Sequence, residues 1–303
     1  MRRFNRVWIG GGKSFRSRGR RPGGVALRWF PFGALALALL LAALATAGRA
    51  ETISLADGNT GVSINPTSAS GMSQWVVDST NYLTQNSFWY RIGSSGAIQP
   101  VSVLSLVSAS VFDLAGDGLD DAAVVKYKNG QGLNITFTYS IIGGQPGSGT
   151  SDVNQQIQIS NTGAQPLNLQ LFQYSQLGLS AGDDTLQFVG SSQVLQTAAS
   201  IGSIDTVVTG TQAPSAYEAI DPAAWPTSPS LDDAAGPVSG NVASAWEWNM
   251  SLAKNGSFVI GEQSALNLSP SAPVPEPSTI VLLGMGAVAG LFFTLRKRLE
   301  ARL

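Results

Sequence analysis

The residues whose types and spacing most suggest chemistry are the aspartates between Asp113 and Asp121. Asp113, Asp117 and Asp121 fall on positions 1, 5 and 9 of a calcium-binding loop, and Gly118 supplies the sharp turn at position 6. An alanine stands at position 3, however, and no bidentate acid follows at position 12. Two interpretations stay open: a calcium site, with calcium as a cofactor, and a hairpin turn with solvated aspartates. The missing ligands favour the turn, and we expect no cofactor.

Composition removes most other catalytic chemistry, because the chain has neither cysteine nor histidine. The commonest general base, the commonest zinc ligand and all thiol chemistry are therefore absent. The adjacent acids Asp183-Asp184 and Asp232-Asp233 would point to opposite faces of a strand. We expect a protein that is not an enzyme and has no catalytic residues. A carbohydrate-active hydrolase with carboxylates paired through space remains the alternative, with Trp225 as the candidate for stacking on a sugar ring.

Alternating apolar and polar residues predict the elements that would position these groups. The alternation is clear in Leu133 to Ile141, in Leu167 to Leu171 and in Trp246 to Leu252. Glycine-containing turn signals separate the runs, and no long amphipathic helix interrupts them. The body is therefore predicted to be all-β, an antiparallel β-sandwich of the jelly-roll or immunoglobulin-like type. A loop over residues 211–240 is expected to hold a short helix near Tyr217 to Ala224.

The same alternation predicts which side chains form the core. Thr136, Thr138 and Glu247 are expected to face outward. The residues expected to be buried are Ile135, Phe137, Tyr139, Leu169, Trp246 and Trp248.

The N-terminal segment, residues 1–50, reads as a secretory signal peptide with a long basic n-region. Nine arginine and lysine residues and no acid lie in residues 1–32, and an apolar core runs from Gly33 to Ala45. Small residues follow, so cleavage by signal peptidase is expected after Ala47 or Ala50. The acidic body then occupies residues 51–269.

The C-terminal segment begins with a proline-rich linker at residues 270–277. Residues 278–295 form an uncharged apolar run, which as a helix would cover about 27 Å and span a bilayer core. The basic residues of the tail, 296–303, would stay in the cytoplasm by the positive-inside rule. This transmembrane helix would hold the precursor in the inner membrane with the body outside.

The same tail resembles the PEP-CTERM sorting signal of bacterial surface proteins. The residues that carry the resemblance are Pro275, Glu276, Pro277, Arg296, Lys297 and Arg298. It implies that an exosortase processes the chain near the motif and that the protein is delivered to the cell surface or the extracellular matrix. Motifs in the body, such as Gly143-Gly144 and Trp246-Glu247-Trp248, are similar to a run found in many PEP-CTERM proteins, and they bring no assigned activity with them.

Between Glu51 and Pro275 the chain holds four basic and seventeen acidic residues, a net charge of −13. A body this acidic repels nucleic acid and is compatible with divalent cations and with neutral or cationic polymers. The resemblance implies a non-catalytic binding or structural role linked to exopolysaccharide or biofilm. A calcium-dependent adhesin that uses the Asp113 loop is the second alternative.

Overall fold

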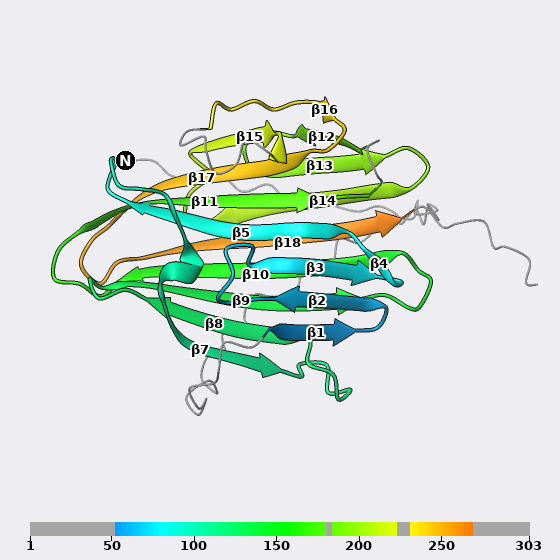
Figure 1. The fold of residues 1–303 in the computed structure, drawn as a ribbon, viewed down its shortest axis with the longest axis horizontal. Helices are drawn as coiled ribbons and strands as arrows, with labels where there is room; N and C mark the ends of the chain where they lie inside the picture. Colours follow the sequence, from blue (N-terminus) through cyan, green and yellow to red (C-terminus); the bar gives the residue numbers. More distant parts are fainter. Residues whose placement is uncertain (1–51, 180–183, 223–230, 269–303) are drawn as a thin grey trace, which may run out of the picture. The chain divides into compact units, whose positions relative to one another are not determined.

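The computed structural model describes residues 52–179, 184–222 and 231–268, and regular structure in these ranges is almost entirely β-strand (Figure 1). The predicted signal peptide, proline-rich linker, transmembrane helix and basic tail lie outside the described residues. In the part of the chain that the structure describes, no helix is long or apolar enough to cross a membrane.

The strands form two sheets in which hydrogen-bonded neighbours run antiparallel, so the predicted β-sandwich is confirmed. Sheet A has the order β1-β2-β3-β5-β11-β17-β15, with β4 paired to β3 and β6 paired to β5. Its strands are β1 (Ile53–Asp57), β2 (Thr60–Ile64), β3 (Met72–Val77), β4 (Thr80–Asn81), β5 (Leu83–Ile92), β6 (Gln99–Pro100), β11 (Leu167–Leu177), β15 (Ala216–Ile220) and β17 (Ala243–Leu252).

Sheet B has the order β16-β12-β13-β14-β18-β10-β9-β8-β7. Its strands are β7 (Ser105–Phe112), β8 (Ala122–Lys128), β9 (Leu133–Gly143), β10 (Thr150–Asn161), β12 (Asp184–Phe188), β13 (Gln193–Ala198), β14 (Gly202–Gly210), β16 (Val238–Ser239) and β18 (Ser257–Leu268). A 3-10 turn over Val101–Val103 leads from sheet A into β7.

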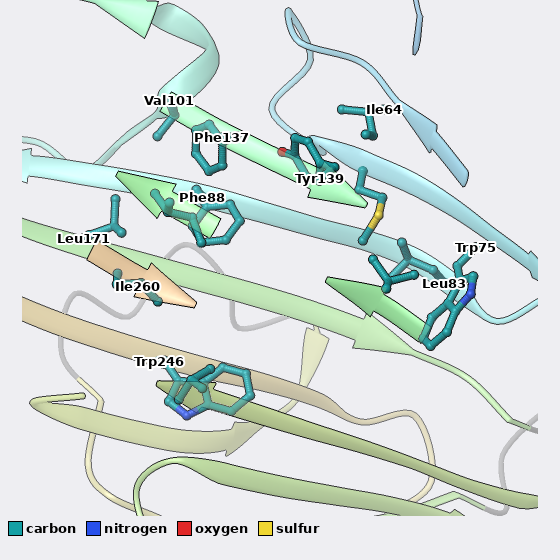
Figure 2. Packing of buried hydrophobic residues seen from close by; sticks show 14 of the residues in the cluster. Ile64, Trp75, Leu83, Phe88, Val101, Phe137, Tyr139, Leu171, Trp246 and Ile260 are labelled. Atoms are coloured by element: carbon teal, nitrogen blue, oxygen red, sulfur yellow. The ribbon is translucent and has the colours of Figure 1, made fainter. Parts of the chain in front are cut away.

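One large apolar core fills the space between the facing sides of the sheets, and it contains all six side chains expected to be buried. Phe137 of β9 lies at an aromatic contact between the sheets, with its ring 5.0 Å from Phe88 of β5 and 6.0 Å from Tyr139 (Figure 2). Thr136 and Thr138 are half-buried on the opposite side of β9, as the alternation predicts.

The expectation that Glu247 faces outward is wrong in one respect, because its side chain is only 6% exposed. Glu247 does lie on the outer side of β17, but a second, smaller apolar cluster covers that side. The buried members of this outer cluster are Phe172, Tyr174, Ile220, Leu231, Ala243 and Ala245. The first half of strand β17, up to Glu247, is therefore buried on both sides, whereas Asn249 and Ser251 are exposed. The alternation along Trp246 to Leu252 did not indicate this difference.

The short helix expected near Tyr217 to Ala224 is also wrong where the structure describes it. Residues Ala216–Ile220 form β15, which pairs in antiparallel register with β17 from Ala216 opposite Glu247 to Ile220 opposite Ala243. Pairing at the sheet edge and burial of Ile220 in the outer cluster outweigh the weak local preference for a helix.

Truncation of Phe137 tests the core. Phe137 is 3% exposed, so Phe137→Ala is expected to lower the free energy of unfolding by about 3–5 kcal/mol through lost burial and a residual cavity. Thr138→Ala, one residue further on the same strand but on the outer side, should cost less than about 1 kcal/mol. Urea unfolding of both variants measures the difference, and equal losses would contradict the assigned strand faces.

Candidate functional site

The aspartates of the predicted calcium loop use their carboxylates to hold the loop's own backbone. The loop joins β7 to β8, whose end residues Phe112 and Ala122 pair directly, as the turn interpretation expected. Asp113 accepts hydrogen bonds from three successive backbone N–H groups, those of residues 116–118, at 2.5–3.2 Å. The hydrogen bond from Gly118 is the main cause that lowers the pKa of Asp113.

The remaining predicted ligands are engaged in the same way. Asp117 accepts the N–H of Leu119 at 2.9 Å, and the buried Asp121 accepts the N–H groups of Leu114 and Ala115 at 2.8 and 2.9 Å. These are the local hydrogen bonds with which aspartate stabilises turns. In the described ranges no cluster of three or more acidic side chains is arranged to hold a metal ion. The geometry therefore supports the hairpin turn.

The Gly143-Gly144 motif marks a contact between the two sheets at one end of the sandwich. Asp57 accepts the N–H of Gly143 at 2.7 Å, and Asn59 accepts the N–H of Gly144 at 2.8 Å. A Cβ atom on Gly143 would lie 1.8 Å from the backbone oxygen of Asp57, so only glycine fits at this close approach. The motif is therefore explained by packing of the β9–β10 loop against the β1–β2 turn.

Asp78 stabilises the other end of the β9–β10 loop. Its carboxylate accepts the N–H groups of Gly147 and Gly149 at 2.6 and 2.9 Å, and the side chain of Asn59 at 3.0 Å. Desolvation raises the pKa of Asp78, but these hydrogen bonds outweigh it, so the net shift is downward. A shallow depression beside the loop is lined by a single acid, Asp152, whereas a glycosidase needs two facing carboxyl groups.

A group of buried polar side chains lies between the sheets, and the sequence did not predict it. We call it the buried polar cluster: Glu262 and Gln155 of sheet B with Asn86 and Gln173 of sheet A. The carboxylate of Glu262 accepts hydrogen bonds from the side-chain amides of Gln173 and Asn86, at 2.5 and 3.3 Å. The cluster thus links the two sheets through their interior.

Glu262 is the acid of this cluster, and its pKa is strongly shifted. Desolvation raises its pKa to about 7, although hydrogen bonds from Gln173, Asn86 and Ser264 oppose the shift. The side-chain oxygens of Gln155 and Gln173 have no hydrogen-bond partner among the described residues. Since Gln155 lies directly opposite Glu262 in the strand register, a protonated Glu262 would bring a donor to a site that has unused acceptors.

A second acidic site lies beside the outer cluster of sheet A. Burial raises the pKa of Glu218, and the negative charge of Asp232 adds to the shift. Burial likewise raises the pKa of Tyr174 to about 12, with a contribution from the charge of Asp221. Asp232 was predicted only as half of an adjacent pair. The structure instead couples it to Glu218, which lies on a strand that the sequence assigned to a loop.

A polar chain crosses three strands of sheet A on the same outer side. Arg91 of β5 donates to the side-chain oxygen of Gln170, whose amide nitrogen donates to Glu247 at 3.0 Å and to Asn249 at 2.6 Å. The guanidinium of Arg91 also lies 5.7 Å from the centre of the Phe172 ring. These contacts keep Glu247 hydrogen-bonded despite its burial.

The tryptophans offer little surface for stacking on sugar rings in the described ranges. Trp75, Trp246 and Trp248 are buried, and the indole N–H groups of the first two donate to Ser151 Oγ and to the backbone oxygen of Ser191. Trp225, the predicted exposed aromatic, lies outside the described residues, as does Asp183. Asp184 is buried.

Residues 273–298 match the family described as the PEP-CTERM protein-sorting motif. The chain carries a PEP-CTERM sorting motif. The match covers the Pro275-Glu276-Pro277 motif and the basic residues up to Arg298 on which the predicted sorting signal rests. The PEP-CTERM motif marks a protein for export and sorting to the cell surface, and it implies processing by an exosortase.

Several solved structures are similar to the body at low identity and low TM-score. They include a bacterial glucoamylase complexed with acarbose (11% identity, TM-score 0.47, 79% of this chain and 36% of that one) and a putative aldose 1-epimerase from Escherichia coli K12 (10%, 0.42, 73% and 99%). A galactose mutarotase-like protein from Lactobacillus casei is a third (10%, 0.40, 72% and 100%). This chain spans about a third of the glucoamylase's length. At these values the similarity says nothing about function, and no curated protein matches the sequence.

Calcium titration tests the Asp113–Asp121 loop. The three carboxylates already accept backbone N–H groups, so isothermal titration should show only weak, millimolar binding that salt screens. Asp117→Asn should leave that weak response unchanged. A micromolar site that Asp117→Asn abolishes would contradict the turn interpretation and favour the calcium-dependent adhesin.

The pH dependence of stability tests Glu262. Its folded-state pKa of about 7 lies above the unfolded value of 4.5, so the folded state keeps a proton that the unfolded state releases. Its contribution to stability is therefore complete below about pH 4.5 and is lost as the pH rises to about 7, on the order of 3 kcal/mol in total. Urea unfolding of the wild type and of Glu262→Gln across this range measures the contribution. Two parallel pH profiles would show that Glu262 does not titrate in this way.

Proposed function

We propose that the body of this PEP-CTERM protein has a non-catalytic binding or structural role in the extracellular matrix, in contact with exopolysaccharide. The observation that carries the proposal is the sorting motif at residues 273–298, joined to a β-sandwich whose described acids act mainly within the fold. The motif directs the protein to the cell surface, where the β-sandwich would provide the binding surface.

The use of the carboxylates supports a non-catalytic body. A catalytic acid or base has to approach its substrate within hydrogen-bond distance, so its oxygens cannot all be engaged in the fold. The acids that accept backbone N–H groups are Asp57, Asp78, Asp113, Asp117, Asp121, Asp184, Asp232 and Asp233. Glu262 lies in the core and Glu247 beneath the outer cluster, so neither is open to a polymer.

The charge of the body indicates which polymer it can contact. Four basic residues cannot neutralise seventeen acidic ones, so an anionic polysaccharide would be repelled over most of the surface. A neutral or cationic polysaccharide meets no such barrier and can bind through hydroxyl, amide and aromatic groups.

Processing would follow the order of the signals. Signal peptidase cuts after Ala47 or Ala50, and residues 278–295 hold the precursor in the inner membrane with the body outside. An exosortase then cuts near Pro275 to Pro277 and releases the body to the surface.

The second candidate is a polysaccharide hydrolase that uses Glu218 and Asp232. Two carboxyls in different environments are what a glycosidase requires. Burial and then the charge of Asp232 raise the pKa of Glu218, which is the direction that suits a general acid, although a backbone hydrogen bond with Asp232 opposes the shift.

Purified matrix material tests the proposed function. Mass spectrometry should find peptides from residues 52–268 there but none containing Arg2 or Arg298, because both signals are removed. The mature protein should co-sediment with the isolated polysaccharide and release no reducing sugar.

Glu218→Gln provides the control for this experiment. In a binding protein the variant should co-sediment as the wild type does, and sugar release should stay at background for both. Sugar release by the wild type that Glu218→Gln abolishes would replace the binding role with the hydrolase. Intact Arg298 peptides in the matrix would contradict processing.

A further inference from the structure

Strand β7 (Ser105–Phe112) ends sheet B, and one of its two hydrogen-bonding sides is unused in the described part of the chain (Figure 1). The inner side pairs with β8 from Ser105 opposite Lys128 to Phe112 opposite Ala122, with a bulge between Leu106 and Ser108. Beyond the bulge the pairing is regular. The outer side therefore presents backbone N–H and C=O groups on which another extended strand can pair.

Apart from the bulge between Leu106 and Ser108, this edge lacks the devices that usually block such pairing. From Val101 to Phe112 the chain has no charged residue, and β7 itself has no proline, although the body as a whole is strongly acidic. Val107 and Val111 are 43% and 40% exposed. Exposed valines on an uncharged edge are typical of a surface that becomes covered.

The charged residues at the two ends of β7 indicate which partner strand covers this edge. At the Ser105 end, β7 lies beside Lys128 and Lys126 of β8, two of the four basic residues of the body. At the Phe112 end, the loop exposes Asp113 and its neighbouring aspartates. An antiparallel copy of the same edge would bring the lysines of each molecule to the aspartates of the other, at both ends. A parallel copy would place like charges together.

We propose that two copies of the chain associate edge to edge through antiparallel β7 strands, so that their two B sheets form one continuous sheet across a two-fold axis. Such an interface is isologous: each copy contributes the same valines, lysines and aspartates. The exposed Leu114 and Leu119 of the turn add apolar surface next to Val103 of the other copy.

Crosslinking of the full chain on intact cells tests the contact directly, since the chain has no native cysteine. Ser110→Cys lies near the proposed axis and should give covalent dimers with a short thiol-specific crosslinker. Val189→Cys, a more exposed position between β12 and β13, is the control and should stay monomeric. Equal crosslinking of both variants, or none of Ser110→Cys, would overturn the proposal. Adducts of Ser110→Cys to a different protein would also overturn it and assign the edge to that partner.

Light scattering of the mature protein released from the surface gives the affinity. Val111→Lys should raise the dimer dissociation constant at least tenfold, whereas Val189→Lys should leave it unchanged. A Lys128→Glu copy should dimerise poorly with itself but recover on mixing with an Asp117→Lys copy, because the reversed charges then match. Unchanged thermal melting would show that these exposed substitutions leave the fold intact. If none of these substitutions changes the dimer dissociation constant, the dimer contact lies elsewhere and the proposal is overturned.

Discussion

Burial of the facing sides of two large antiparallel sheets is the constraint on which the structure depends. Each sheet has an apolar side that must be removed from water, and the aromatic contact of Phe88 with Phe137 lies in the middle of the resulting core. The core is not uniformly apolar, because Glu262 and its amide partners lie within it. Their hydrogen bonds from sheet to sheet favour one alignment of the sheets over others, since any slip would leave several buried polar groups without partners.

At the ends of the sandwich, aspartate side chains stabilise the loops through hydrogen bonds to their backbone. Asp57 and Asp78 bind the β9–β10 loop, and Asp113 closes the β7–β8 turn by accepting N–H groups. The pKa values of Asp78 and Asp113 are lowered in the fold, so their hydrogen bonds to the loops weaken when acid pH protonates these two carboxylates. Glu262 responds in the opposite direction. Acid pH therefore weakens the hydrogen bonds of these aspartates while Glu262 keeps its stabilising proton, and a rise in pH through about 7 removes that proton.

The sequence predicted most where one side of a strand faces the core and the other faces water. Strand β9 and its buried Phe137 satisfy that condition, and their faces were assigned correctly. Strand β17 does not satisfy it, because small residues such as Ala245 are buried in the outer cluster on the side that was expected to face water. An alanine at such a position does not distinguish a buried side from an exposed one. Glu262 was missed for a similar reason: a charged residue on the core side looks like a break in the alternation until its partners from the other sheet are known. Spacing alone also could not tell whether Asp113 binds an ion or its own loop, since both uses require the same residues.

The contrast between the two halves of the prediction has a physical origin. A sorting signal carries its meaning in the order and composition of its parts, here Pro275 to Pro277, the apolar run and the basic end. A binding surface is assembled from strands that are distant in sequence, as when Glu218 of β15 meets Asp232 across a connecting segment. The tail can therefore be recognised in a chain whose body has no curated match.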